Sequence, residues 1–366
     1  IRAIRLLPRS TVFHKQDWFV AAAYQADYSR EAMGFLSRAS ERFFHERPYR
    51  EHTCYLLLTK KPEGRRESSS LLSNLLRRSL APAQTLQPQA YLEFLDQAGQ
   101  FERVLRDSGF ARLRRLGDEE LTGTLTEAGL LERYCGLMPA GSAPLLQDIH
   151  LEGGIRIGDK HCQLYALADA ADLPQLCGSR VNYDRYSTDR TKFSTGFASP
   201  LGQLLPCNHL FNQYIFLEDV PLTLQRLESK RLRLQSLSAY SRENAIARDA
   251  THAFLNEALG QQRLPVKAHF NVLAWTHSPE KTQELRNTVS SAIAQLDATP
   301  RLETDGAPQL YWAGLPGNAA DFPMNDTFDT FLEQACCFLN LETSYRSSLS
   351  PVGLRLGDRM TGRPVH

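Results

Sequence analysis

The sequence lacks the short motifs that mark most catalytic sites. It contains no Gly-x-x-x-x-Gly-Lys-Ser/Thr phosphate loop, no Gly-x-Ser-x-Gly nucleophile elbow and no His-Glu-x-x-His zinc motif. These absences exclude a P-loop nucleotide site within the 366 residues and leave no nucleophile, base and orienting group to nominate. We therefore expect no catalytic, cofactor-binding or metal-binding residues in this segment.

Long apolar runs and an excess of charge are also missing. No apolar run approaches the roughly 18 residues that a membrane-spanning helix requires. Lys and Arg number 42 against 41 Asp and Glu, so the net charge is +1 and gives no global attraction to nucleic acid or anionic lipid. The length suffices for two or three globular domains with cores of their own.

The seven cysteines do not form a disulfide framework, because their number is odd and their spacing does not repeat. We expect them to be small, buried residues of a reducing compartment, which favours the cytoplasm. The nearest metal-like grouping is His161-Cys162 with Cys207-x-His209, and it matches no structural-zinc spacing. These residues are therefore expected in ordinary core and turn positions.

The order of predicted elements favours an α+β fold, with mixed antiparallel sheets, flanking helices and one long helix. We expect two subdomains, an N-terminal one over 1–140 and a second over 141–350, with a boundary in the Pro-, Ala- and Gly-containing run 138–145. Hydrophobic periodicity predicts strands at 10–19, 52–59, 264–276 and 307–316, and helices at 27–48, 70–82, 88–109, 118–137, 278–297 and 325–340.

The tract 221–262 is predicted to form one helix of more than about 50 Å, because no proline interrupts it and no glycine precedes Gly260. Its polar residues outnumber the apolar ones, so it is expected to pack one stripe and leave the rest for solvent or a partner. Residues 154–169 read as a hairpin that turns at Gly158-Asp159. Because 353–359 repeats the same residue template, 351–366 is predicted as a second hairpin.

One basic and aromatic stretch, 179–193, is a candidate contact surface. Cations beside aromatic rings suit a nucleic-acid strand or a groove in a partner protein. Asp184 and Asp189 dilute the charge, and a solvated loop folded on its own domain is the alternative. The candidate partner-contact residues are Arg180, Tyr183, Arg185, Tyr186, Arg190, Lys192 and Phe193.

A second candidate, 60–80, combines six basic and two acidic residues with leucines that would share one side of a short helix. That is the form of an interfacial amphipathic helix beside a polybasic loop. A surface helix docked on its own core is the alternative. The candidate membrane-surface residues are Arg65, Arg66, Leu72, Leu75, Leu76, Arg77 and Arg78. At most, peripheral membrane association is predicted.

Longer phrases at 154–216, 227–245, 265–276, 305–331 and 345–366 strongly resemble the TraG family of conjugative-transposon ATPases. The resemblance covers nearly the whole chain, is strongest from about Ile149 onward, and is looser in the first third. It implies similarity to the VirB-type ATPases of type IV secretion systems, which form hexameric motors at the cytoplasmic face of the inner membrane. In the family, the closing hairpin leads into a nucleotide-binding domain, for which ATP and Mg are implied.

On this resemblance, the chain is expected to be a piece of a longer protein, a non-catalytic N-terminal docking and scaffold region whose phosphate loop lies downstream. The implied partners are other type IV secretion components, inner-membrane platform proteins and further copies of the full-length chain. The implied location is cytoplasmic and peripheral at the inner membrane. The alternative is a single-stranded nucleic-acid or substrate-contact domain of the same machine that uses 179–193. A free-standing enzyme is a third interpretation.

Overall fold

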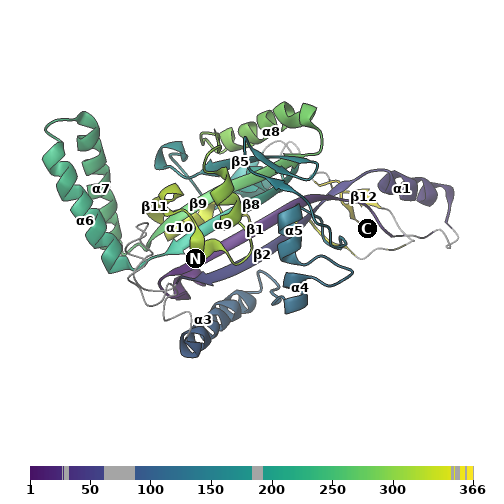
Figure 1. Ribbon diagram of the computed structural model, residues 1–366, viewed down its shortest axis with the longest axis horizontal. Helices are drawn as coiled ribbons and strands as arrows, with labels where there is room; N and C mark the ends of the chain where they lie inside the picture. Colours follow the sequence, from purple (N-terminus) through teal and green to yellow (C-terminus); the bar gives the residue numbers. More distant parts are fainter. Residues whose placement is uncertain are drawn as a thin grey trace.

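The structure is a computed structural model that describes residues 1–26, 28, 33–61, 87–183, 193–347, 350, 355–358 and 361–365. Within these residues, one antiparallel sheet of nine strands lies between two layers of helices, which confirms the α+β class (Figure 1). The order along the sheet is β2 (Tyr49–Lys60), β1 (Thr11–Ala22), β8 (Asn208–Leu217), β9 (Pro265–Thr276), β5 (Lys160–Leu167), β4 (Ile155–Ile157) and β3 (Ile149–His150). Two short strands join its sides, β10 (Arg301–Leu302) on β5 and β11 (Phe328–Phe331) on β9.

The sheet crosses the predicted domain boundary. Strands β1 and β8 pair from Thr11↔Leu217 to Phe19↔His209, although they come from the two predicted subdomains. The run 138–145 lies between α5 and β3, and the chain on both of its sides contributes strands to the same sheet. The two predicted segments therefore share one sheet.

Helices cover both faces of the central strands, so β1 is buried continuously from Thr11 to Val20. One face carries α3 (Pro88–Asp107), α8 (Thr282–Ala294) and α10 (Leu332–Cys337), which pack on Phe211, Ile215 and Phe270. The other face carries α5 (Leu130–Gly136) and α9 (Ala307–Ala313), which pack on Trp18 and Tyr214. Burial on both faces places most side chains of the central strands β1, β8 and β9 in a core.

Several predicted elements are confirmed. Strands β1, β2 and β9 and helix α3 occupy the predicted stretches, and α8 follows a 3-10 turn that begins at Pro279. The β4–β5 hairpin turns at Gly158, whose φ of +55° favours glycine. The closing hairpin is also confirmed, since β12 (Leu356–Gly357) pairs with β13 (Pro364–Val365). A second two-stranded sheet joins β6 (Arg180–Tyr183) to β7 (Phe193–Gly196).

Other predictions were wrong. The tract 118–137 is two short helices, α4 (Asp118–Thr122) and α5, because Gly123 breaks the helix with a φ of +90°. The predicted strand 307–316 is helix α9, whose first turn holds Pro308 and whose Leu310 and Tyr311 are buried. The predicted helix 325–340 divides into strand β11 and helix α10.

The predicted helix 27–48 is confirmed only as α1 (Phe35–His45), and the predicted helix 70–82 lies outside the described residues. Short 3-10 helices complete the description: η1 (Ile4–Leu6), η3 (Ala170–Asp172), η5 (Ser199–Leu201), η6 (Pro279–Lys281), η7 (Ala319–Asp321) and η8 (Met324–Asp326). Of the helices in the described part of the chain, none has both the length and the apolar character needed to cross a bilayer.

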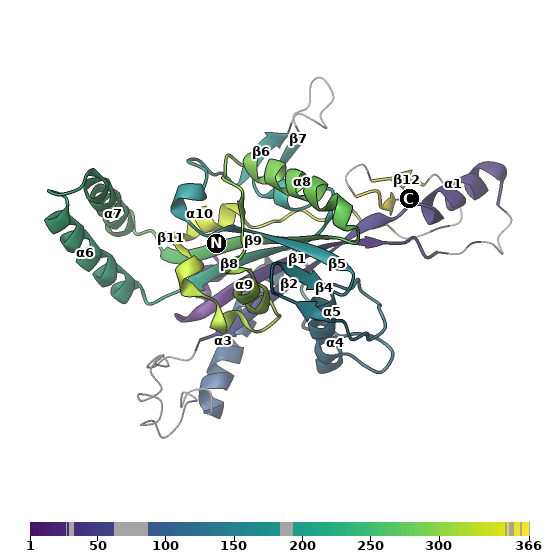
Figure 2. The ribbon, with the colours of Figure 1, turned by 45° about the horizontal axis from the view of Figure 1, so that its top comes forward.

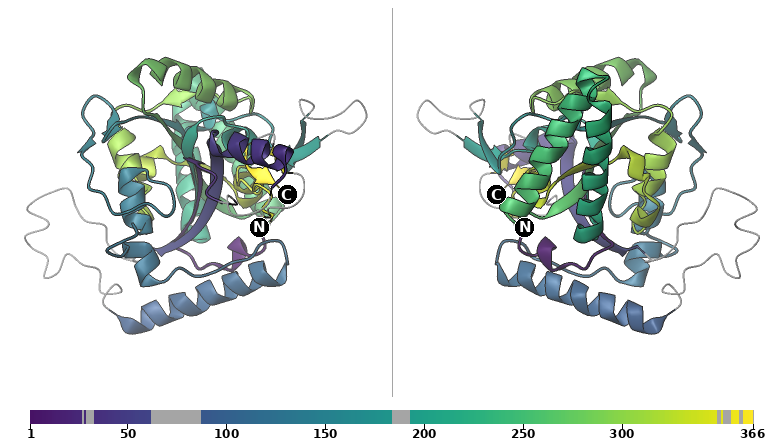
Figure 3. Two further views of the ribbon diagram at one scale, coloured as in Figure 1. Left: turned by 90° about the vertical axis from the view of Figure 1, so that its right-hand side faces the viewer. Right: turned by 90° about the vertical axis from the view of Figure 1, so that its left-hand side faces the viewer.

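The single long helix predicted over 221–262 is instead a helical hairpin. Helix α6 (Val220–Leu237) and helix α7 (Arg242–Gly260) run side by side in opposite directions and project from one end of the sheet (Figure 2; Figure 3, right). The chain reverses over 238–241, where Ser241 has the extended conformation of an N-cap residue. The Ser238 hydroxyl bonds the Gln235 carbonyl oxygen at 2.7 Å, and such side-chain bonds compete with helix continuation.

Candidate functional site

The two ends of the predicted partner-contact stretch, 179–193, lie on the antiparallel strands β6 and β7. Tyr183 pairs with Phe193 across β6 and β7, while Arg185, Tyr186, Arg190 and Lys192 lie outside the described residues, as do the side chains of Tyr183 and Phe193. Arg180 is described, and its guanidinium donates to the Ser194 hydroxyl at 2.9 Å and lies 3.4 Å from Glu342. This arginine is therefore paired within its own chain. The predicted membrane-surface residues, Arg65, Arg66, Leu72, Leu75, Leu76, Arg77 and Arg78, all lie outside the described residues.

A polar cluster that no sequence pattern indicates is buried under the α10 face of the sheet. Lys15 and Asp17, two residues apart on β1, form an ion pair, and Gln213 on β8 donates to Asp17 at 2.6 Å. On β2, His52 Nε2 lies 2.7 Å from Asp17 Oδ1, and its Nδ1 lies 3.0 Å from the Thr343 hydroxyl. The separation of these residues along the chain hides the cluster from any local motif.

The charges in this cluster compensate one another. Burial by itself would raise the pKa of the Asp17 carboxyl, but the Lys15 ammonium and the His52 and Gln213 donors hold it well below its usual range. Burial likewise opposes the charge of Lys15, and the Asp17 carboxylate overcomes it, so that the pKa of Lys15 is raised. Both groups are therefore ionised at neutral pH and held as a desolvated pair.

Asp17, His52 and the Thr343 hydroxyl follow one another in the order of a nucleophilic triad. Their environment argues against that role. Asp17 already neutralises Lys15, and its carboxylate is fully buried. Asn340 donates its backbone N–H to Gln213 at 2.8 Å, so the segment 340–343 is tied to the sheet by this same cluster. We interpret the cluster as a clamp that holds the C-terminal segment on the sheet.

A second polar cluster lies on the opposite face of the same strands. Asn212 joins its members, because its side chain bonds His14 at 3.1 Å, Gln16 at 2.7 Å and Asn271 at 2.9 Å. Asn271 in turn bonds His269 at 2.9 Å. Burial lowers the pKa of His14 and of His269 to about 4, so both imidazoles are neutral at pH 7. This neutral network provides no charge for chemistry.

The metal-like grouping does not assemble. His161 and Cys162 lie on β5, whereas His209 lies on β8, and β9 separates these strands. The His209 ring nitrogens instead lie 2.9 Å from the Cys207 carbonyl oxygen and 3.1 Å from that of Leu201. Among the described residues, no group of three or more His, Cys, Asp or Glu side chains is arranged to hold a metal ion.

The α6–α7 hairpin is firmly attached at its base. Asp219 caps α6 by accepting from the Leu222 N–H at 3.1 Å. Arg226 donates to Asp329 of β11 at 2.9 Å, and the Phe254 ring of α7 stacks on Phe331 with centroids 4.3 Å apart. The seam between the two helices is apolar, formed by Leu227, Leu234, Thr251, Leu255 and Ala258, all buried. The hairpin is therefore held in a fixed direction by both polar and aromatic contacts.

The tip of the hairpin is apolar and exposed. We define the tip as Leu232, Leu237, Tyr240 and Ile246, which lie within two turns of the reversal and are 52%, 43%, 87% and 60% exposed. Single exposed apolar residues are ordinary on a protein surface, but four at the end of a projecting element concentrate apolar area where a partner has access. An exposed tyrosine is a typical anchor of protein interfaces, in which aromatic residues are enriched.

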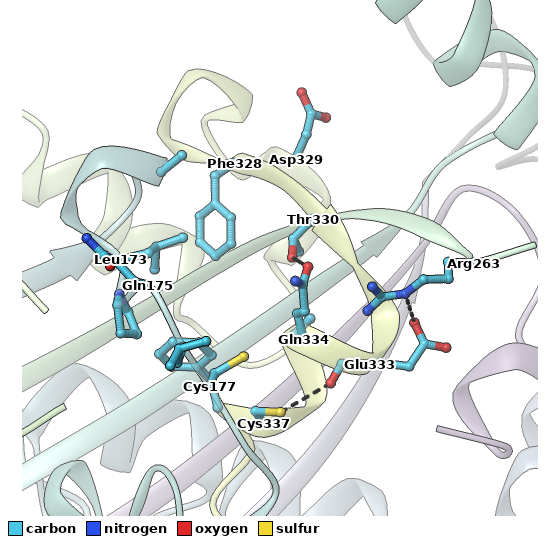
Figure 4. A pocket seen from close by; sticks show the side chains of 15 residues that line it. Leu173, Gln175, Cys177, Arg263, Phe328, Asp329, Thr330, Glu333, Gln334 and Cys337 are labelled. Carbon is cyan, nitrogen blue, oxygen red and sulfur yellow. Dashed lines mark hydrogen bonds and ion pairs between the residues drawn. The ribbon is translucent and has the colours of Figure 1, made fainter. Parts of the chain in front are cut away.

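Two cavities are among those that the described residues line. The first, of about 490 Å³, lies beside the base of the hairpin, and Figure 4 shows its lining of Leu173, Gln175, Cys177, Arg263, Phe328, Asp329, Thr330, Glu333, Gln334 and Cys337. The second, of about 450 Å³, lies at the α1 end of β1 and is lined in part by Tyr24, Tyr49, Glu51, Arg133 and Arg363.

Comparisons with known proteins add no further constraint. No protein-family model matches the chain, and no curated protein is significantly similar to it in sequence. The geometry described above therefore provides the observations from which a function is inferred.

Proposed function

We propose that this chain is a non-catalytic docking and scaffold module of a conjugative-transfer motor, as its resemblance to the TraG family implies, and that the α6–α7 hairpin is its partner-binding arm. The observation that carries the proposal is the projecting hairpin with an apolar tip at Leu232, Leu237, Tyr240 and Ile246. A soluble domain that keeps four such side chains at the end of an extension gains nothing from them in folding. Their use is in association.

The buried polar clusters support a scaffold role rather than catalysis. The ion pair of Lys15 and Asp17 is compensated internally, and the imidazoles of His14 and His269 are neutral and hydrogen-bonded to neighbouring groups. Catalytic groups need access to substrate and a pKa matched to their task, and these groups have neither. A sheet fixed on both faces by such networks is a rigid base for a projecting arm.

The partner we propose is a protein of the secretion machine at the inner-membrane platform, with an apolar pocket that accepts Tyr240 and Ile246. The base contacts Arg226–Asp329 and Phe254–Phe331 would then transmit force between that partner and the sheet. In the full-length protein, the nucleotide-binding domain would supply the movement, and further copies of the chain would arrange several arms around a ring. The proposed location is cytoplasmic, at the inner membrane.

The nucleic-acid alternative receives less support from the described residues. Arg180, the one described side chain of the predicted contact set, is engaged by Ser194 and Glu342 within the chain. Binding of single-stranded DNA that weakens steeply with salt, and that is lost in Arg185→Ala and Arg190→Ala variants, would favour this alternative.

The proposal is tested by changing the tip without changing the fold. A Tyr240→Ser, Ile246→Ser double variant of the parent gene should lower conjugative transfer at least tenfold, since each anchor contributes roughly 1–2 kcal/mol to binding. Lys230→Gln, an exposed change on α6 outside the tip, is the matched control and should leave transfer unchanged. Thermal unfolding and cellular protein level should be equal in both variants.

Photocrosslinking identifies the partner directly. A benzophenone amino acid in place of Tyr240 should form adducts with an inner-membrane component of the transfer machine, and one in place of Lys230 should form far fewer. Wild-type transfer by the double variant would refute the docking role. ATP turnover by the purified chain that is lost when the chain unfolds would refute the non-catalytic role.

A further inference from the structure

Two cysteines that are distant in the sequence meet in the cavity beside the hairpin base. Cys177 lies in the segment between η3 and β6, and Cys337 is the last residue of α10. Both line the cavity of about 490 Å³, and each thiol shifts the pKa of the other. Figure 4 shows the two sulfur atoms side by side at the wall of this cavity. Both side chains are partly exposed, so small solutes reach them.

The environments of the two thiols shift their pKa values in opposite directions. The neighbouring Cys337 lowers the pKa of Cys177 to about 7, against burial and with help from the Arg263 guanidinium. The neighbouring Cys177 and burial raise the pKa of Cys337. The Cys337 thiol donates its S–H to the Glu333 carbonyl oxygen at 3.4 Å, so this thiol keeps its proton. Cys177 is thus the nucleophile of the pair, and Cys337 is the thiol that stays protonated.

The other described cysteines lack this combination. Burial raises the pKa of Cys54, Cys162 and Cys207 to about 12 and also raises the pKa of Cys135, which makes their thiolates scarce at neutral pH. Cys336 is adjacent to Cys337 on α10, but it does not line the cavity, and burial raises its pKa. A thiolate with a protonated thiol in contact is the arrangement that redox-sensitive cysteine pairs share.

We propose that Cys177 and Cys337 form an oxidisable dithiol, a modification site that hydroperoxides convert to an intramolecular disulfide. The Cys177 thiolate attacks one peroxide oxygen, the O–O bond breaks, and the released hydroxide takes up a proton to leave as water. Cys177 is then a sulfenic acid. The Cys337 sulfur attacks the Cys177 sulfur, the S–O bond breaks, and the Cys337 proton leaves with the hydroxide as a second water. Two thiols lose two electrons, and one peroxide becomes two water molecules.

The fold permits the required approach of the sulfur atoms. A disulfide brings them to about 2 Å, closer than two thiols in van der Waals contact. Cys177 lies in a segment without regular secondary structure, whereas Cys337 is fixed by α10. The segment 173–179 therefore moves to bring the Cys177 sulfur to Cys337, while α10 and β11 stay in position. A reducing compartment would restore the dithiol, which makes the modification reversible. This inference does not depend on the proposed docking role.

The experiment begins with the fully reduced wild-type chain and one equivalent of hydrogen peroxide. We expect the loss of two free thiols and of two hydrogen atoms from the intact mass, with no dimer. Trypsin leaves Cys162 and Cys177 on one peptide, so a second protease that cuts at Asp169 and Asp172 is needed to separate them. The expected cross-link joins the peptide of Cys177 to the peptide that contains Cys336 and Cys337.

Serine variants assign the partners. Cys336→Ser should form the disulfide at the wild-type rate, whereas Cys337→Ser should stop at a Cys177 sulfenic acid that dimedone traps. Cys177→Ser should consume peroxide at least tenfold more slowly, because it loses the thiolate. As a readout without substitution, a limiting amount of iodoacetamide should label Cys177 first in the wild-type chain, with a rate that rises around pH 7.

Several results would contradict the proposed dithiol. A cross-link through Cys336, a disulfide between two chains, or oxidation of Cys162 or Cys207 at the rate of Cys177 would overturn the proposal. So would iodoacetamide labelling in which Cys177 is no faster than the buried thiols. None of these results bears on conjugative transfer by the tip variants, so this inference and the docking role fail separately.

Discussion

Acid should destabilise the fold through two buried histidines of the central sheet. Burial lowers the pKa of His14 and of His269 to about 4, from about 6.5 in the unfolded chain. For His269 the hydrogen bonds explain the preference for the neutral form. Its Nδ1 donates to the Asp326 carbonyl oxygen at 2.6 Å, and its Nε2 accepts from the Asn271 amide at 2.9 Å. A proton added at Nε2 would face that amide donor.

The sign and the magnitude follow from linkage. Because the folded pKa is the lower one, the unfolded chain binds more protons below pH 6.5, and stability falls as the pH falls from 6.5 towards 4. At pH 5 the unfolded imidazoles are almost fully protonated and the folded ones almost fully neutral. Each histidine then costs about 2 kcal/mol relative to pH 7.5, and the pair costs about 4 kcal/mol. This is a large part of the 5–15 kcal/mol that stabilises a typical domain.

Urea titrations between pH 7.5 and 4.5 measure this loss as the free energy of unfolding. His14→Gln and His269→Gln should each remove about 1.4 kcal/mol per pH unit from the slope near pH 5, whatever they do to absolute stability. His150→Gln is the control, because His150 is exposed on β3, and its slope should equal that of wild type. A free energy of unfolding that stays flat from pH 7.5 to 5 would refute the reasoning, as would protonation of folded His269 near pH 6.5 by NMR.

Three further predictions concern the clusters and the hairpin base. Asp17→Asn should cost about 3–5 kcal/mol in urea unfolding, because it leaves the Lys15 ammonium buried without its counter-charge; a loss below about 1 kcal/mol would contradict the ion pair. A fluorophosphonate probe should not label Thr343, since we interpret its bond to His52 as a clamp, and labelling that depends on His52 would instead reveal a nucleophile. Phe254→Ala should destabilise by about 2 kcal/mol and speed proteolytic cutting within 238–241, because the stack on Phe331 holds the hairpin base; unchanged cutting would place the anchoring elsewhere.

Local patterns predicted the long strands β1, β2, β5 and β9, but they missed β8 and did not predict what the polar residues do. The four consecutive polar residues from His14 to Asp17 are of types usually exposed to solvent, yet all four side chains are buried. Their partners are far away in sequence: Gln213 for Asp17, Asn212 for Gln16. The local sequence of β1 does not predict that helices cover both faces of the strand, because those helices come from other parts of the chain. Burial on two faces is a tertiary property.

The helical elements show the same limit in two ways. The hairpin reversal lacks glycine and proline, and the only local signal was the serines at 238 and 241, which suit a helix end and an N-cap. Helix α9 carries leucine, tyrosine and tryptophan, residues that also suit a strand. There, tertiary contact decides, because the Tyr134 hydroxyl bonds the Tyr311 carbonyl oxygen at 2.5 Å and the two rings stack.

The cavity thiols and the docking arm meet at one residue, Arg263. Its guanidinium lies 4.4 Å from the centroid of the Phe331 ring, pairs with Glu257 of α7, and lies 3.5 Å from Glu333 of α10. It therefore joins the end of the hairpin to the helix that carries Cys337, and its charge favours the Cys177 thiolate. Sequence could not reveal this junction, because an arginine between two helices and a strand is an ordinary surface residue until the fold brings these elements together. The Arg263 guanidinium therefore has two effects. Its plane stacks on the Phe331 ring and its N–H groups bind two carboxylates, which holds the hairpin in place. Its positive charge also favours the thiolate form of Cys177.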